Sequence, residues 1–235
     1  MLKYNELIDK LKEIKKKGYV KTSRSGNTGI GKTLEDLLGI KENNIAGPDA
    51  KKIEIKSARK NASSMLTLFT KSPLPPKANS ILLQRFGYQS KRGNNRKELH
   101  TTVNVLDFNI IKGNKGFKVR ITEDKIELIS VNEEVLGYWD KKTLKDSFER
   151  KLPRLIYVKA NSKNSGKDEE FLFDEAWDLK GFGFDNFVNL LSEGKISVDI
   201  RIGQYPNGNP HDHGTGFRVV PSKLDLCFSD RKRII

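Results

Sequence analysis

The chain has 235 residues, of which 36% are hydrophobic and 9% aromatic, enough to bury one sizeable core and too many for a disordered protein. No apolar run reaches the roughly 18 residues that a membrane span needs, and a lone cysteine, Cys227, excludes an internal disulfide. The formal net charge of +14, from 44 Lys and Arg against 30 Asp and Glu, favours a polyanionic partner, although a merely soluble basic protein would also carry it.

The basic residues are spread along the whole chain, which suits a groove around nucleic acid better than a disordered basic arm. An acidic membrane surface is the other polyanion that such a charge would attract. The first residues are amphipathic and charged, without the apolar segment of a signal peptide. Because a single cysteine also fits a reducing compartment, we expect a cytoplasmic protein with no membrane partner.

In the first part of the chain, the apolar residues follow helical and extended periods in turn. They predict a helix at 4–17, a Gly/Ser/Asn-rich loop at 23–31, a helix at 33–38 that stops at Gly39, a turn at 43–48, strands at 52–57 and 66–70, an extended loop at 71–79, an apolar element at 81–86 and a basic loop at 90–95.

The second part of the chain shows the same mixture of periods. It predicts strands at 106–111, 117–122 and 125–130, a helix at 142–151, a strand at 154–159, a helix at 185–192 ended by Gly194, a strand at 196–202, a Gly/Pro/His-rich loop at 203–216 and a strand at 217–220. Because no internal repeat and no clear linker is present, the expected architecture is one α/β fold with two lobes that grip a ligand.

Residues 26–33 (GNTGIGKT) match the G-x-x-x-x-G-K-[ST] pattern, which can cradle nucleotide phosphates. The pattern has this meaning when it joins a buried parallel strand to a long helix, but the preceding residues 19–24 are short and polar. A loop that contacts a nucleic-acid backbone through its glycines and Lys32 is the favoured interpretation, and a P-loop ATPase is the alternative.

The segment that carries the chemistry runs from Pro48 and Asp49 to Lys56. Side chains alternate along a strand, so Glu54 and Lys56 share one face while the isoleucines between and before them enter a core. Asp49 lies at the turn into this strand, where its carboxylate can approach that of Glu54. Two neighbouring carboxylates repel each other unless a cation joins them, and Mg²⁺ suits two oxygen ligands of this kind.

With Mg²⁺ on Asp49 and Glu54, a scissile phosphate would be polarised and a bound water acidified. Lys56 would position or deprotonate the attacking water and stabilise charge on the phosphorane. Glu35, on the predicted helix at 33–38, is placed to reach the same metal or to orient Lys56. The alternative is an ordinary amphipathic edge strand whose Glu and Lys are solvated, because D-x-x-x-x-E-x-K by itself is common.

Near the C-terminus, Asp199 and Arg201 share the polar face of an alternating strand, and His211, His213 and Arg218 follow. The two histidines lack a zinc-site spacing, so zinc is disfavoured. A turn held by His and Asp hydrogen bonds remains the plain alternative. Arg forks to guanine O6 and N7, His donates to guanine or phosphate, and Asp accepts from cytosine N4, so these residues can read G·C pairs.

Taken together, these residues resemble the MvaI/BcnI family of type II restriction endonucleases, which is related to the MutH mismatch-repair nickase. The resemblance follows the same order along nearly the whole chain, with residues 107–185 matching weakly. It rests on 26–38 (GNTGIGKTLEDLL), Pro48-Asp49 with 53–56 (IEIK), 66–73 (LTLFTKSP), 198–203 (VDIRIG) and 211–218 (HDHGTGFR), which look most like the MvaI-like members, and on 85–88 (RFGY) and 221–225 (PSKLD), which look more like the BcnI-like members.

The resemblance implies a single restriction-endonuclease-like α/β domain over residues 1–235, with a PD-(D/E)xK site on a mixed sheet flanked by helices. A catalytic lobe centred on 1–90 and a recognition lobe centred on 185–225 would form a DNA-binding cleft. It implies that Glu35, Asp49, Glu54 and Lys56 are catalytic, with Asp49, Glu54 and Glu35 as metal ligands. It implies base contacts by Asp199, Arg201, His211, His213 and Arg218, and we expect Lys32 and Lys71 to contact the DNA backbone.

The resemblance also implies a Mg²⁺-dependent monomer that cuts one strand of duplex DNA at a time, with a cognate DNA methyltransferase as its partner. MvaI-like members cut CC(A/T)GG and BcnI-like members CC(C/G)GG, so a CCNGG-type site is expected, and the HDHGTGFR block favours A·T at the centre. A MutH-like nickase and a DNA-binding protein without catalysis are the alternatives.

Overall fold

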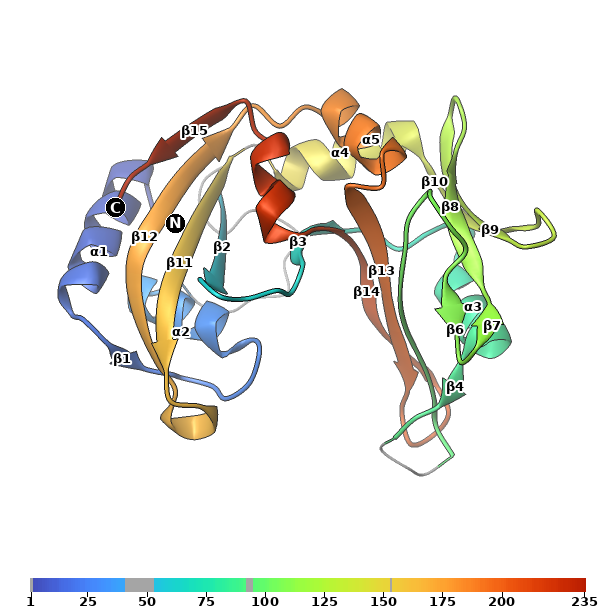
Figure 1. Cartoon of the computed structure of the whole chain (residues 1–235), viewed down its shortest axis with the longest axis horizontal. Helices are drawn as coiled ribbons and strands as arrows, with labels where there is room; N and C mark the ends of the chain where they lie inside the picture. The colour runs from blue at the N-terminus through green and yellow to red at the C-terminus, as the bar shows by residue number, and fades with distance from the viewer. Residues whose placement is uncertain (1, 41–52, 92–94, 153) are drawn as a thin grey trace. The chain divides into compact units, whose positions relative to one another are not determined.

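The main sheets are built from strands that lie far apart in the sequence (Figure 1). The computed structural model describes residues 2–40, 53–91, 95–152 and 154–235. Its contacts divide the chain into two units. The first unit combines Met1–Ser64, Glu149–Phe182 and Phe228–Ile235, and the second combines Met65–Phe148 and Gly183–Cys227.

The first unit is a mixed sheet with two helices on it. Its elements are α1 (Tyr4–Lys16), β1 (Val20–Lys21), α2 (Gly29–Leu38), β2 (Glu54–Arg59), β11 (Leu155–Lys163), a short 3₁₀ turn (Gly166–Asp168), β12 (Glu170–Lys180) and β15 (Asp230–Arg233). The strand order is β1-β12-β11-β2, with β15 also paired to β12. The β2–β11 pair is parallel and the others are antiparallel. Strand β2 lies at the end of this order.

Apolar side chains from the two helices and three of the strands form the core of the first unit. On α1, Leu7, Leu11 and Ile14 are spaced so that they fall on one face, and all three are buried. They pack with Ile30, Leu34 and Leu38 of α2 against the sheet. The sheet supplies the remaining core residues, which are Ile53, Ile156, Val158, Ala160, Phe171, Phe173 and Ala176.

The second unit contains two larger sheets and one small hairpin. Its elements are β3 (Leu66–Thr70), α3 (Ala78–Phe86), β4 (Tyr88–Gln89), β5 (Lys97–Val103), β6 (Ile110–Ile111), β7 (Asn114–Lys115), β8 (Phe117–Ile121), β9 (Lys125–Ser130), β10 (Val135–Asp140), α5 (Phe184–Ser192), β13 (Ile196–Gln204), β14 (Pro210–Val219) and a 3₁₀ turn (Pro221–Leu226). Helix α4 (Lys141–Lys151) continues along the chain into the first unit. The strand orders are β3-β14-β13-β5-β4 and β10-β9-β8, and β6 pairs with β7.

Aromatic rings fill the core of the second unit around Phe217 of β14. Its ring stacks on Phe69 at a centroid distance of 4.8 Å and meets the edges of Trp139 and Phe187, each at 5.2 Å. Because Phe217 lies at the centre of this cluster, the strand that carries it is firmly placed on the core.

The predicted α/β class, a mixed sheet flanked by helices, is confirmed, as are the amphipathic helix at the N-terminus and the stop at Gly39, whose φ is 74°. The predicted turn at 43–48, residue 52 and positions 92–94 of the basic loop lie outside the described residues. Among the helices that the structure describes, none is long and apolar enough to cross a membrane.

Several predicted boundaries were wrong for identifiable reasons. Residues 203–216 were predicted as a loop because of their Gly, Pro and His content, but 210–216 belong to β14, whose pairing with β13 overrides local preference. Of the strand predicted at 106–111, only Ile110–Ile111 is extended. Strand β12 was missed because it contains four acidic residues, which the structure pairs with cations such as Lys60, Lys159 and Lys163.

A buried carboxylate joins α1 to the sheet of the first unit. Asp178 of β12 is 1% exposed and accepts hydrogen bonds from Arg154 Nε (2.7 Å) and Nη2 (2.5 Å) and from the Tyr4 hydroxyl (2.9 Å). The guanidinium of Arg154 also lies 3.7 Å from the Tyr4 ring centroid. Burial raises the pKa of Asp178, but the hydrogen bonds from Arg154 and Tyr4 outweigh it, so the pKa lies below its ordinary value.

We predict that Asp178→Ala lowers the free energy of unfolding by about 3 kcal/mol, because it leaves the guanidinium of Arg154 without its carboxylate. The folded-state pKa of Asp178 is below its unfolded value, so this stabilisation is present above pH ~4 and is lost as the pH falls through the folded-state pKa. Urea unfolding of both proteins from pH 7 to pH 3 measures it. Asp168→Ala is the control, because the Lys21–Asp168 pair is exposed. An equal effect of both substitutions would contradict the proposed role of burial.

Candidate active site

The predicted catalytic strand is β2, and its side chains alternate as expected. Ile55 packs against the core of the first unit, whereas Glu54 and Lys56 lie on successive positions of the opposite face. Lys56 Nζ lies 2.5 Å from Glu54 Oε1, so the two groups form a charge-assisted hydrogen bond. The Glu54 side chain is 5% exposed and that of Lys56 27%, so the amine reaches solvent from a buried carboxylate.

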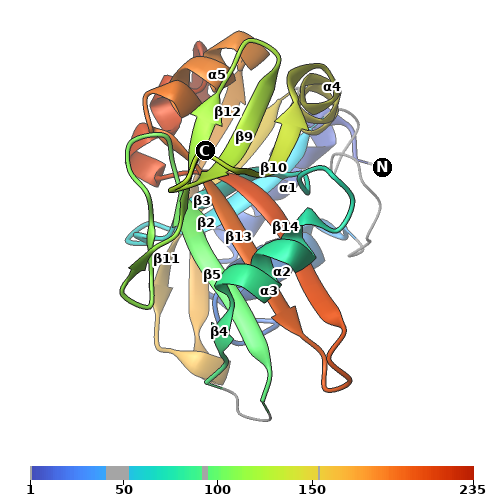
Figure 2. The ribbon, with the colours of Figure 1, turned by 90° about the vertical axis from the view of Figure 1, so that its right-hand side faces the viewer.

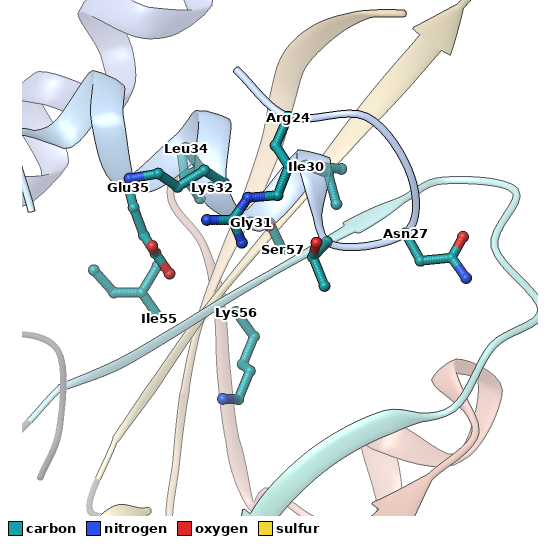
Figure 3. A pocket seen from close by; sticks show the side chains of 11 residues that line it. Arg24, Asn27, Ile30, Gly31, Lys32, Leu34, Glu35, Ile55, Lys56 and Ser57 are labelled. Atoms are coloured by element: carbon teal, nitrogen blue, oxygen red, sulfur yellow. The ribbon is translucent and has the colours of Figure 1, made fainter. Parts of the chain in front are cut away.

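A pocket of about 340 Å³ opens between β2 and the N-terminal part of α2. Figure 3 shows Glu35 and Lys32 reaching from α2, Arg24 from the preceding loop, and Lys56 extending from β2 on the side away from Ile55. The pocket is lined by Arg24, Asn27, Thr28, Ile30, Gly31, Lys32, Leu34, Glu35, Ile55, Lys56 and Ser57. Three cationic side chains in one small pocket suit an anionic ligand such as a phosphodiester.

The P-loop-like string at 26–33 forms the rim of this pocket, and its structural context excludes the P-loop arrangement. A P-loop follows a central parallel strand, whereas here the preceding β1 is two residues long and pairs antiparallel with β12. Helix α2 begins at Gly29, four residues earlier than predicted. Lys32 Nζ lies 2.7 Å from Asp36 Oδ1, one turn further along the same helix.

The loop before α2 is tied to the end of β2 by Arg59, which sequence reasoning had missed. Arg59 binds the carboxylate of Glu169 with both Nε and Nη2, each at 2.6 Å, and its Nη2 also donates to the carbonyl of Gly26 at 3.2 Å. The main-chain carbonyl of Glu169 in turn accepts from the N–H of Thr22. Arg59 therefore positions the loop that carries Arg24 and Asn27 into the pocket.

The predicted metal ligands are only partly described. Asp49 lies outside the described residues, and within residues 2–40, 53–91, 95–152 and 154–235 no three His, Cys, Asp or Glu side chains are grouped as metal ligands would be. Glu54, a buried carboxylate beside Lys56, and Glu35, which lines the adjacent pocket, offer the oxygen ligands that hard divalent cations prefer. By their chemistry, both carboxylates suit a divalent ion, and Asp49 is the predicted third ligand.

In the second unit, the predicted recognition residues surround a buried acid. Asp199 of β13 is 3% exposed, and its Oδ2 lies 2.7 Å from Arg201 Nε and 3.1 Å from Arg218 Nε. Its Oδ1 accepts from the Thr102 hydroxyl of the neighbouring β5 at 2.9 Å. Asp199 therefore holds both guanidinium groups on one face of the sheet, a geometry that favours orienting the arginines over contacting a base itself.

The two predicted histidines lie together on the β13–β14 hairpin. The ring of His211 stacks on Tyr205 at 4.3 Å and meets that of His213 at 4.1 Å, whereas Asp212 between them accepts a hydrogen bond from Asn79 of α3. Lys71, predicted to contact the DNA backbone, is exposed, and its main chain is held by Thr215 O and the Trp139 indole N–H. Tyr205 and Asn79 could not be found from the sequence, because each contacts side chains that only the folded chain brings close.

Comparison with known proteins identifies the chain. The model of the MvaI/BcnI restriction endonuclease family matches residues 8–228. The chain belongs to this family. It is 33% identical to restriction endonuclease MvaI solved as a complex with a cognate DNA substrate, with a TM-score of 0.87 and full coverage of both chains. It is 32% identical to MvaI solved without DNA, with a TM-score of 0.58, covering 100% of this chain and 99% of that one. A search of curated proteins found no match.

Membership of the family confirms the predicted resemblance and makes the chain a type II restriction endonuclease with a restriction-endonuclease-like fold. The residue roles are a separate matter, and they remain predictions. The structure pairs Glu54 with Lys56 and places Glu35 and Lys56 on the lining of one pocket in the first unit, and in the second it sets Asp199 against Arg201 and Arg218.

We predict that Arg59→Ala destabilises this MvaI/BcnI-family enzyme by about 3 kcal/mol, because the buried Glu169 carboxylate loses both of its hydrogen bonds from the guanidinium. The stability of Arg59→Lys should lie between those of the wild type and Arg59→Ala, since an ammonium keeps the charge but not the two-pronged contact. Urea unfolding at pH 7 distinguishes the three proteins. A lysine variant as stable as the wild type would show that the forked contact adds nothing to the stability.

Proposed function

We propose that this restriction endonuclease uses Mg²⁺ to hydrolyse duplex DNA at a short G·C-rich site of the CCNGG type, with CC(A/T)GG favoured. The observation that carries the proposal is the Lys56–Glu54 pair, held at 2.5 Å on β2 beside a cationic pocket. Duplex DNA as substrate is supported by the solved complex of MvaI with its cognate DNA. The favoured central A·T pair rests on the HDHGTGFR block at 211–218.

Asp49, Glu54 and Glu35 are the residues that would hold Mg²⁺. The bound ion would supply Lewis-acid polarisation of the phosphate and an acidified water. Glu54 keeps one carboxylate oxygen on Lys56, so the same side chain orients the amine. This sharing fixes the amine next to the place where the phosphate would bind.

Lys56 would act on the attacking water and on the reacting phosphate. A lysine ammonium has three N–H donors, and Glu54 accepts one of them, which leaves two for ligands. One donor can orient the water and the other can stabilise the negative charge that develops on the phosphorane. Because the amine is fixed before the substrate binds, little reorganisation is needed during the reaction.

The arginines of the second unit are the proposed base readers. A guanidinium presents a planar fork that matches O6 and N7 of guanine. Asp199 Oδ2 lies against the Nε atoms of Arg201 and Arg218, so this carboxylate leaves the terminal Nη groups of both arginines for a base. His211 and His213 would add contacts from the hairpin, and we now assign Asp199 the task of orienting the arginines.

The remaining partners are proposed on the same basis. Lys32 and Lys71 would contact the DNA backbone, and the catalytic and base-reading residues lie in different units, which supports assigning catalysis to the first and recognition to the second. We further propose a monomeric cytoplasmic enzyme that cuts one strand per binding event, with a methyltransferase of the same specificity protecting the host DNA.

We predict that Lys56→Ala lowers the rate of plasmid cleavage with Mg²⁺ by at least about a hundredfold, because the water and phosphorane lose their fixed donor. Binding to a CC(A/T)GG duplex, measured by fluorescence anisotropy, should stay within about threefold, since one phosphate contact is lost. Lys21→Ala is the matched control, because that exposed lysine pairs with Asp168 away from the pocket.

The same assay separates the rival functions. Discrete linear fragments of supercoiled plasmid support a restriction enzyme, whereas nicked circles that persist support a nickase, and sequencing the ends gives the site. Plasmid cleavage by Lys56→Ala at the wild-type rate would contradict the proposed role of the amine.

We predict that Arg201→Ala and Arg218→Ala each cost about 1–3 kcal/mol of site-specific binding and relax discrimination at one G·C pair. Lys32→Ala, as a backbone contact, should weaken binding to all sequences equally and reduce the salt dependence of binding. Anisotropy titrations with cognate and singly substituted duplexes at several salt concentrations measure both effects. A uniform loss for the arginine variants would make them backbone contacts.

A further inference from the structure

Strand β14 contains one residue more than its partner requires, in the middle of the proposed recognition segment. Ile200 of β13 lies opposite Thr215, but Ile202, two positions on, lies opposite Asp212, three positions back. The extra residue makes a β-bulge, and Gly214 within it adopts a φ of 87°. A bulge of this kind shifts which side of the sheet each following side chain faces.

The bulge decides which side chains share a face. His211 and Arg218 are seven positions apart, an odd number, so on a regular strand they would point to opposite sides. In the structure His211 lies opposite Gly203 and Arg218 opposite Ser197. Gly203 and Ser197 are six positions apart in β13, an even number, so the side chains of His211 and Arg218 lie on one face. It is the face that carries Asp199 and Arg201, because the intervening isoleucines of β13 are buried on the other.

Asn79 closes the bulge from the opposite, buried face. Its Nδ2 donates to Asp212 Oδ2 at 2.7 Å and lies 2.9 Å from Thr215 Oγ1, so one carboxamide binds the strand on both sides of the extra residue. Thr215 Oγ1 is also 3.3 Å from Asn79 Oδ1, and Asp212 Oδ1 accepts from the N–H of Gly214. Figure 2 shows α3, which carries Asn79, lying against the sheet of β5, β13 and β14.

Two of the three residues in this contact, Asn79 and Thr215, are buried. Asn79 is 4% exposed and Thr215 is fully buried, so neither can exchange its partner for water without a cost. The carboxylate of Asp212 strengthens the bond because it is charged. Asp212 is itself exposed, but its carboxylate binds Asn79, whereas His211 stacks on Tyr205 and His213 meets the ring of His211.

We propose that Asn79 is a specificity-determining positioning residue, whose carboxamide holds the bulge that places His211 on the same face as Arg201 and Arg218. Asn79 touches no base in this proposal and acts through the register of β14. The proposal rests on the proposed function in one respect, namely that this face reads the DNA bases.

The decisive variant is Asn79→Asp, which keeps the size of the side chain but sets a carboxylate against Asp212. We expect the ratio of kcat/KM for the cognate site to that for singly substituted sites to fall by about tenfold or more, since one charged hydrogen bond becomes a repulsion. The swap Asn79→Asp with Asp212→Asn restores a donor–acceptor pair and should return the ratio to within about threefold of the wild type. Asn186→Ala is the matched control, because that side chain binds the carbonyls of Leu226 and Cys227 in the same unit. It should change stability and leave the ratio unchanged.

A second readout does not depend on cleavage. The chain has three histidines, so their ring protons can be followed individually by NMR. In Asn79→Asp the resonances of His211 and His213 should shift as the stack with Tyr205 changes, and the swap should restore them, while His100 on β5 serves as the internal reference. Unchanged histidine resonances, an unchanged specificity ratio, or a swap that fails to restore either would overturn the role of Asn79. Absence of any wild-type cleavage would instead defeat the proposed function, and the NMR comparison would still decide the role of Asn79.

Discussion

A buried carboxylate must be matched by a cation, and this constraint organises the protein. Glu54, Asp178, Glu169 and Asp199 are all nearly inaccessible to solvent, and each binds an arginine or lysine from a neighbouring position. An unmatched buried charge would cost several kcal/mol, so each acid dictates where its cation lies. In a chain with an excess of 14 positive charges, this is how some cations are held in defined places while the rest stay on the surface.

The same pairing stabilises the fold in two places and involves candidate functional residues in two others. Asp178 binds Arg154, and Glu169 binds Arg59, through both Nε and Nη2, so the forked contact of each arginine is made within the fold. Glu54 and Asp199 instead hold cations that keep donors to spare, Lys56 in the first unit and the two arginines in the second. The difference lies in how much of the cation the acid occupies, and it separates groups that stabilise the protein from groups that can bind a ligand.

Local sequence pattern predicted what depends on one strand or helix, and it failed where distant strands meet. The alternation around Glu54 and Lys56 was enough to place both on one face, and the spacing of Leu7, Leu11 and Ile14 was enough for α1. The contact of Asp199 with Arg218 was not accessible in this way, because it depends on the register between β13 and β14. Likewise, residues 26–33 match the P-loop pattern, but the strand before them pairs antiparallel with β12. This pairing, which excludes a P-loop, depends on the fold and not on the local sequence.

Arg154 connects the first turn of the chain to the strand that carries the candidate catalytic residues. Its side chain binds Asp178 beside Tyr4, and its main-chain carbonyl accepts the N–H of Glu54. Through Arg154, the position of the first residue of β2 therefore depends on the ring of Tyr4. A substitution of Tyr4 would therefore be felt at Glu54 through only one intermediate residue, Arg154.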